Sequence, residues 1–219
     1  MLFDWGFVLE ILPTLAQAAV ITIEATVVSF VLALVLGLVF ALARMSARPY
    51  VSLPVGAFVE FIRSTPVLIQ IFFLYFVFPQ FGVVIPALVA GVMALGLHYS
   101  TYCSEVYRAG LENVPRGQWE AATALNLGPM ATYRDIILPQ AIPPMVPALG
   151  NYLVGLFKET PLLSAIAVLE LMQTAKIIGS ETFRYLEPIT LVGVFFLVMS
   201  LASAALIRRV EAWLRHRRD

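Results

Sequence analysis

The sequence predicts an all-α membrane protein with five transmembrane helices, its N-terminus outside and its C-terminus in the cytoplasm. Of its 219 residues, 60% are hydrophobic and only 13% are charged, whereas soluble domains are about one quarter charged. Five apolar stretches reach the roughly 20 residues that a crossing needs. Ten of the 14 Lys and Arg residues fall in segments assigned to the inner side, which agrees with the positive-inside rule.

The first half of the chain holds three of the expected spans. Residues 1–13 are typical of an amphipathic interfacial helix, and they lack the basic cluster that precedes a cleavable signal. The first span, 15–43, is followed at once by Arg44, whose charge indicates the cytoplasmic side. The second span, 55–78, has polar residues in its first half and aromatic residues in its second, and the third span is 85–107.

The second half holds two more spans, separated by polar segments. Residues 108–140 form a long polar interval on the inner side. The fourth span, 141–160, contains three prolines, and the polar stretch 170–187 is expected outside. The last span, 189–207, leads into a strongly basic tail that suits the cytoplasmic side and contact with anionic lipid. No internal repeat or linker divides the chain, so we expect a single transmembrane domain over its whole length.

Composition also excludes several classes of function. A net charge of zero argues against nucleic acid as a partner. The single cysteine, Cys103, cannot form an internal disulfide, and the two histidines show no metal-ligand spacing. The chain lacks the G-x-x-x-x-G-K-[ST] phosphate loop of nucleotide-binding proteins. We therefore expect no catalytic residue, no metal site and no cofactor in this chain.

The polar interval, residues 108–140, predicts a helix, a turn and a second short helix outside the membrane. Strong helix formers fill 118–125, after a proline suited to the first turn of a helix. Asn126 can adopt the left-handed conformation that ends a helix, and Gly-Pro at 128–129 extends the break. The second helix is expected at 130–138, stopped by the next proline. Such a unit either fits a groove on a soluble partner or packs as an ordinary loop on its own bundle.

Polar residues inside spans are candidates for a solute path, because a charge there is costly and usually faces a cavity or a partner charge. Lys158 and Glu159 precede Pro161, whose helix break would free backbone carbonyls near the midplane. Either Glu159 lines the path, or the two charges neutralise each other within the fold. His98, Tyr99 and Tyr102 offer hydrogen bonds and cation–π contact, although aromatic residues in spans most often serve packing.

Two acid–base pairs have helical spacing. Glu60 and Arg63 are i, i+3 neighbours, so a salt bridge is the favoured interpretation over contact with a solute. Glu105 and Arg108 have the same spacing at the inner end of the third span, and the same interpretation applies. We keep Glu60 and Arg63 among the candidate path residues.

Within the polar interval, residues 120–139 resemble the signature of ABC-importer permeases: EAA, three residues, Gly, nine residues and Ile-x-Leu-Pro. The matching positions are occupied by Glu120, Ala121, Ala122, Ile136, Leu138 and Pro139. Asn126 stands at the glycine position, and Gly128 follows two residues later. The stretches EFIRSTPVLIQIFF, SEVYRAGLENVPRGQWEAA and LPQAIPPMVPALGNYLVGLFKETPLLS extend the resemblance to permeases of the polar amino-acid uptake group.

The resemblance implies the type I ABC-importer permease fold in a bacterial inner membrane. The residues of the signature, including Asn126 and Gly128, would form a cytoplasmic coupling helix that docks on an ATPase. The implied partners are a second permease subunit, identical or paralogous, two ATP-binding cassette subunits that hold ATP and Mg, and an extracytoplasmic solute-binding protein. The resemblance implies that Glu159 faces the translocation path.

The resemblance also suggests a substrate class. The stretches YRAGLENVPRGQWEAATALNL and KETPLLSAIAVLELMQTAKIIGSETFRYLEP look closest to permeases for ectoine and hydroxyectoine. A polar amino acid such as glutamine, arginine or histidine is the close alternative. The rival from another class is a self-contained channel or secondary transporter that works without ATP.

Overall fold

The computed structural model describes residues 3–216, and the side chains of residues 3–213. All its regular elements are helical, and residues 3–216 contain no strand. The helices are α1 (Trp5–Arg44), α2 (Pro49–Ser64), α3 (Val67–Phe72), α4 (Ala87–Glu112), α5 (Arg116–Ala124), α6 (Pro129–Ala131), α7 (Leu138–Glu159), α8 (Leu171–Thr182) and α9 (Leu186–His216). Short π or 3₁₀ segments follow α3 (Phe73–Val77 and Phe78–Phe81) and flank α7 (Thr132–Ile137 and Thr160–Ile166).

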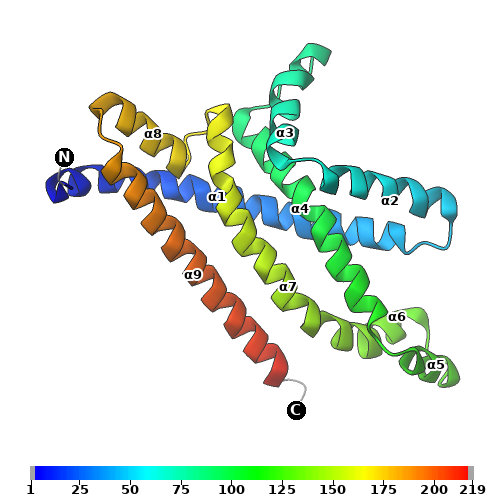
Figure 1. Cartoon of the computed structure of the whole chain (residues 1–219). Helices are drawn as coiled ribbons and strands as arrows, with labels where there is room; N and C mark the ends of the chain where they lie inside the picture. Colours follow the sequence, from blue (N-terminus) through cyan, green and yellow to red (C-terminus); the bar gives the residue numbers. More distant parts are fainter. Residues whose placement is uncertain (1–2, 217–219) are drawn as a thin grey trace.

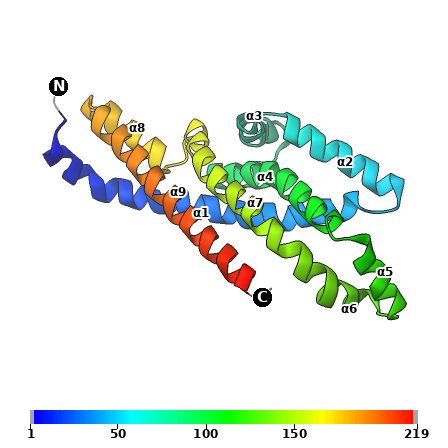
Figure 2. The same cartoon turned by 60° about the horizontal axis from the view of Figure 1, so that its bottom comes forward.

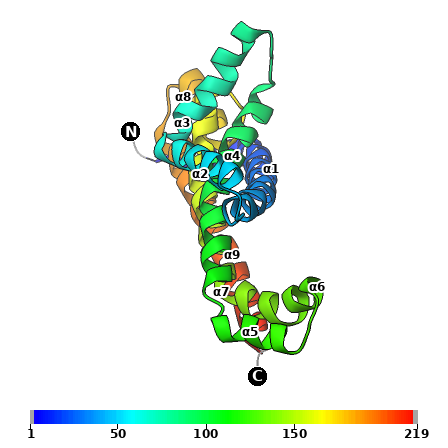
Figure 3. The same cartoon turned by 90° about the vertical axis from the view of Figure 1, so that its right-hand side faces the viewer.

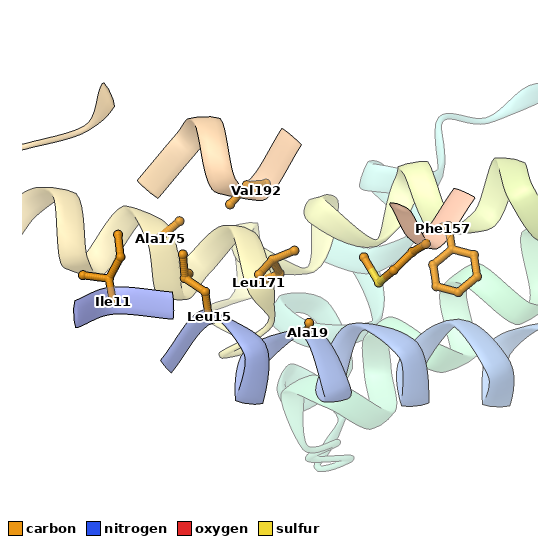
Figure 4. Close-up of a cluster of buried hydrophobic side chains, with 8 residues drawn as sticks. Ile11, Leu15, Ala19, Phe157, Leu171, Ala175 and Val192 are labelled. Carbon is orange, nitrogen blue, oxygen red and sulfur yellow. The ribbon is translucent and has the colours of Figure 1, made fainter. Parts of the chain in front are cut away.

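Helix α1 is a single 40-residue helix with Pro13 inside it. The interfacial helix expected at 1–13 and the span expected at 15–43 are therefore continuous, and residues 1 and 2 lie outside the described part. Ile11 and Leu15 pack with residues of α8 and α9 in one buried cluster (Figure 4). This packing accounts for the continuity, because burial on both sides of Pro13 outweighs the local loss of a backbone hydrogen bond.

The start of α1 is tied to the start of α9 by an ion cluster, which we call the terminal cluster (Asp4, Arg184 and Glu187). Arg184 donates hydrogen bonds to Glu187 (2.7 Å) and to Asp4 (3.2 Å), and its guanidinium lies 4.3 Å from the ring centroid of Phe7. The backbone N–H of Phe7 and the Arg184 guanidinium lower the pKa of Asp4.

Helices α1 and α4 make the most extensive contact in the molecule. In Figure 1, α4, α7 and α9 run past α1, with α7 packed between α4 and α9. Gly37 of α1 shows how close α1 and α4 come: a Cβ there would lie 2.6 Å from Cys103 Cβ and 2.9 Å from the Ser100 carbonyl oxygen. Small residues therefore let these two helices pack backbone to backbone.

The polar interval projects from the end of the bundle. Helices α5 and α6 lie together beyond the bundle in Figure 2 and at the far end from α3 and α8 in Figure 3. The second helix differs from the prediction: α6 leads through the π segment Thr132–Ile137 directly into α7. Pro139 does not stop the helix, because a proline in the first turn of α7 needs no backbone N–H partner. Pro143, Pro144 and Pro147 also lie inside α7.

Two described helices, α1 and Leu186–Trp213 of α9, are long and apolar enough to cross a membrane. The number rises to four if two bent pairs each count as one span. The span expected at 55–78 is one such pair, because α2 and the helical segment after it meet at 103°. Helix α4 does not meet this test, because its C-terminal half carries polar residues. Several of them, such as His98, Ser100 and Thr101, are buried. Five spans and their orientation stay a prediction.

Candidate functional site

Helix α5 carries the first part of the signature and ends as the sequence predicts. Asn126 has a left-handed backbone (φ 54°), and its N–H donates to the Thr123 carbonyl (2.9 Å) while the Leu127 N–H donates to the Ala122 carbonyl (3.0 Å). These two bonds are the Schellman pattern that closes a helix at a left-handed residue. Gly128 has an ordinary extended conformation (φ −69°). Asn126 therefore makes the turn, and Gly128 contributes no positive φ.

The base of this projection is packed and its tip is exposed. Ala122 and Ile137 are buried, and the rings of Trp119 and Tyr133 meet edge to face at 5.4 Å. At the tip, the side chains of Leu125 and Met130 are 71% and 78% exposed. Glu120, Ala121, Leu138 and Pro139 are also exposed, whereas Ile136 is half-buried. A packed base with an exposed apolar tip suits docking to another protein.

The tip also carries a local ion pair. Arg134 donates two hydrogen bonds to Asp135, at 2.7 and 3.0 Å, and this contact holds the pKa of the Asp135 carboxyl below its usual value. Both side chains are exposed, so the pair contributes little to stability in water. It leaves the tip with balanced charge beside its apolar residues.

A second site lies between α4 and α7, where aromatic rings form a continuous group that we call the aromatic site (His98, Tyr99, Tyr102 and Tyr152). The ring centroids of His98 and Tyr102 are 5.4 Å apart, and those of Tyr102 and Tyr152 are 5.5 Å apart. Tyr99 lies 6.3 Å from Tyr152 and 6.0 Å from His98. His98 and Tyr99 are nearly buried. Three of these rings were predicted as path residues, and the structure brings them together with a fourth.

Glu159 closes the aromatic site at the end of α7. Its carboxylate interacts with the hydroxyl of Tyr99, and its Oε2 atom is buried with no hydrogen-bond partner among the described residues. Gly155 permits this approach, since a Cβ there would lie 3.1 Å from the Tyr99 hydroxyl oxygen. A buried carboxylate oxygen without a partner is costly, and among the described path candidates Glu159 is the one that carries such an atom.

Lys158 does not neutralise Glu159. Lys158 is exposed, and no ion pair joins it to Glu159 within the described part of the chain. Adjacent residues of a helix point in different directions, which explains why the two charges separate. The alternative of an internally neutralised pair therefore has no support in the geometry.

Glu60 and Arg63 belong to a different group, the inner ion network (Arg44, Glu60, Arg63, Glu105, Arg108 and Glu112). Arg63 pairs with Glu60 at 2.6 Å and with Glu105 at 3.6 Å. Glu105 also pairs with Arg44 of α1 and, at 2.9 Å, with Arg108 of its own helix. Both predicted i, i+3 ion pairs are thus present. Glu105 also connects α1, α2 and α4. Among the described residues, no hydrogen bond or ion pair joins Glu60 to the aromatic site.

Sequence reasoning missed Tyr152 and Gln70. Tyr152 precedes Glu159 by seven residues, which is two helical turns, so this spacing could have placed both on one face. Gln70 is the polar interruption in the apolar run VLIQIFF, and its amide contacts His98. Among the described residues, no group of three His, Cys, Asp or Glu side chains is arranged to hold a metal ion.

Comparison with known protein families gives a match over most of the chain. Residues 33–216 match the model of the family described as "Binding-protein-dependent transport system inner membrane component". One relative, described as the probable amino-acid ABC transporter permease protein y4tG of Sinorhizobium fredii, is 46% identical over 208 residues, which cover 95% of this chain and 90% of the relative.

Two further similarities extend over nearly the whole chain. The arginine transport system permease protein ArtQ of Bacillus subtilis is 33% identical over 217 residues, covering 98% of this chain and 99% of the relative. A solved structure described as an amino acid ABC transporter with histidines superposes with a TM-score of 0.90 at 35% identity, covering 97% of this chain and 99% of that one.

Proposed function

The chain belongs to the family of binding-protein-dependent transport system inner membrane components, and from this premise we propose that it is the permease subunit of an ABC importer for a small zwitterionic solute. The observation that carries the proposal is the family match over residues 33–216. The chain is an inner-membrane, multi-pass protein of this family. The work of transport is then done by ATPase subunits on other polypeptides, because this chain lacks a phosphate loop.

The projection formed by α5 and α6 is the proposed contact with the ATPase. Its packed base transmits force, since Ile137 is buried at the start of the helix that leads into α7. Its exposed tip, with Leu125 and Met130, supplies apolar surface for a groove on the partner. Closure of the ATPase subunits would move the projection and, through α7, the aromatic site.

The proposed path runs along the aromatic site, with Glu159 facing the cationic group of the solute. The five spans expected of one chain would not enclose a polar path by themselves, so a second permease subunit, identical or paralogous, would complete it about a two-fold axis. An extracytoplasmic binding protein would deliver the solute. The two forms of the permease, open inward and outward, are then populated according to bound ATP and binding protein.

For the substrate, the relatives favour a polar amino acid. The two relatives described above are named for amino-acid and arginine transport, and neither of these names supports ectoine. Ectoine and hydroxyectoine remain in the proposal as small zwitterions that the sequence resemblance suggests. Titration of the partner binding protein with arginine, glutamine, histidine, ectoine and hydroxyectoine would choose among these solutes. A binding protein that binds none of them would exclude all five as substrates.

Co-purification tests the assembly. The tagged chain, extracted from its native membranes in mild detergent, should bring with it a P-loop ATPase and a second permease chain. Replacement of the tip residues Leu125 and Met130 by serine should release the ATPase and retain the second permease. A chain that purifies alone and still conducts solute would instead favour the channel or secondary transporter.

A further inference from the structure

Gln70 contacts His98 of the aromatic site. It lies on α3, whereas the predicted path residues lie on α2, α4 and α7. We propose that Gln70 is a positioning residue for the transport path: its amide ties the bend between α2 and α3 to His98 of α4. The proposal rests on the function proposed above, because it concerns the path for solute. Gln70 acts through His98, and none of its recorded contacts is to Glu159.

The bend is a break in a segment expected within the membrane. Helix α2 ends at Ser64, Thr65 is extended, and Pro66 precedes α3, giving the 103° turn. Pro66 has no N–H to donate, and backbone groups left open in a membrane need a partner within the protein. Gln70 Nε2 lies 2.8 Å from the Ile62 carbonyl oxygen and 3.2 Å from the Thr65 carbonyl oxygen. The Ile62 carbonyl also accepts from the Thr65 N–H (3.3 Å) and the Thr65 hydroxyl (3.0 Å), so the Gln70 amide adds to these bonds and also donates to the Thr65 carbonyl.

The same nitrogen reaches the aromatic site. Gln70 Nε2 lies 3.1 Å from His98 Nδ1 and 2.8 Å from Thr65 Oγ1. An amide nitrogen only donates, so this contact is a hydrogen bond when Nδ1 is the unprotonated nitrogen of the His98 ring. His98 in turn meets Tyr99 and Tyr102 edge to face. The orientation of one ring in the path is thus set from the bend.

The amide is shared among more acceptors than it can satisfy. Its nitrogen has two hydrogens and four acceptor atoms within 3.2 Å, two of them carbonyl oxygens of the bend. Its oxygen, Oε1, is buried without a hydrogen-bond partner in the described part of the chain. These carbonyl oxygens require that the nitrogen face them, which leaves the oxygen as the unsatisfied atom. A change in the bend would therefore alter the contact with His98 directly.

A double-mutant cycle tests the link. Gln70→Met keeps the length of the side chain and removes its hydrogen bonds, and Thr65→Val is the matched control, since it removes one partner of the amide and leaves the His98 contact. Uptake into vesicles holding the complete transporter is measured with radiolabelled arginine and radiolabelled ectoine. Gln70→Met should raise the KM of the transported probe about fivefold, and Thr65→Val by less than about twofold, because only the former releases His98.

The cycle is completed with His98→Gln alone and combined with Gln70→Met. The KM of the combined variant should equal that of His98→Gln, since both changes break the same contact between Gln70 and His98. If the two effects multiply, or if Gln70→Met leaves KM unchanged, Gln70 does not position His98. Should Gln70→Met fail to assemble, Gln70→Asn, which keeps the amide and shortens its reach, must show the same rise in KM. If the unaltered transporter takes up solute without ATP, the proposed function is wrong. The double-mutant cycle would still show whether Gln70 and His98 act together.

Discussion

The projection at the end of the bundle and the aromatic site within it are built in opposite ways. The projection is local: α5, the turn at Asn126 and α6 lie within one short stretch, and its tip residues are exposed. The aromatic site joins α4 to α7, and beside it Glu159 Oε2 is buried without a hydrogen-bond partner among the described residues. In the function proposed above, the first region is the contact with another protein and the second is the contact with a small molecule.

Because the two regions are separate, mutations should be able to affect contact with the ATPase and contact with the solute independently. Changes at the tip should alter how much transport each ATP molecule drives and leave solute affinity alone. Changes in the aromatic site should alter solute affinity and leave ATPase binding alone. A variant in one region that changed the property assigned to the other region would contradict this separation.

Glu159→Gln should have the largest effect on transport. The change keeps the shape of the side chain and removes the charge that the proposed function places opposite a cationic group, so a charge-assisted contact worth about 1.5–3 kcal/mol should be lost. The KM for uptake should rise about tenfold to a hundredfold. Co-purification of the ATPase should be unchanged, and a KM equal to that of the unaltered protein would remove Glu159 from the path.

Asn126→Ile should come next and act on coupling. A β-branched residue at φ 54° is strained by about 1–2 kcal/mol, which should loosen the turn that holds α5. We expect uptake driven by ATP to fall about fivefold to tenfold at unchanged KM. Asn126→Gly is the control, since glycine adopts a positive φ freely, and it should transport normally. Equal loss in both variants would mean that the asparagine side chain, and not the turn, matters.

Met130→Ser should weaken the ATPase contact more modestly. The side chain is 78% exposed in this chain, so the substitution costs the membrane protein little, whereas docking would lose about 1 kcal/mol of apolar burial. The half-life of the ATPase complex in detergent should shorten about fivefold. Phe81→Ser, which changes a 76% exposed residue near the opposite end, is the matched control and should leave the half-life unchanged.

The terminal cluster predicts a small dependence of stability on pH, outside both functional regions. The pKa of Asp4 is lowered in the folded protein, so its contribution is present above the ordinary carboxyl pKa and is lost as pH falls through the lowered value. The melting temperature in detergent should stay level from pH 7 to about 5 and fall below about pH 4. Arg184→Gln should make that fall shallower; an unchanged slope would show that the cluster does not contribute.

The projection was largely predictable because its signals are local. Helix formers before Asn126 predicted α5, and asparagine at a helix end predicted the left-handed turn. The continuation into α7 was not predictable in the same way. Pro139 looks like a stop in the sequence, but the π segment before it and its place in the first turn let the helix continue.

The aromatic site was predictable only where its residues are neighbours in sequence. His98, Tyr99 and Tyr102 were found because they share one helix, whereas Tyr152 comes from α7 and meets them through packing of α4 on α7. Gln70 was missed for the same reason, since its partner is 28 residues away. Lys158 was grouped with Glu159 by adjacency, although neighbours on a helix diverge.

Uptake into sealed vesicles tests directly whether this permease transports solute only when ATP is hydrolysed. Vesicles holding the purified transporter, with its binding protein outside and ATP inside, should accumulate the solute against its gradient. The same vesicles with a non-hydrolysable ATP analogue, or with the ATPase removed, should not. That result would establish a permease whose transport is coupled to ATP hydrolysis. Solute flux of equal size without ATP hydrolysis would contradict the account and identify a self-contained channel or secondary transporter.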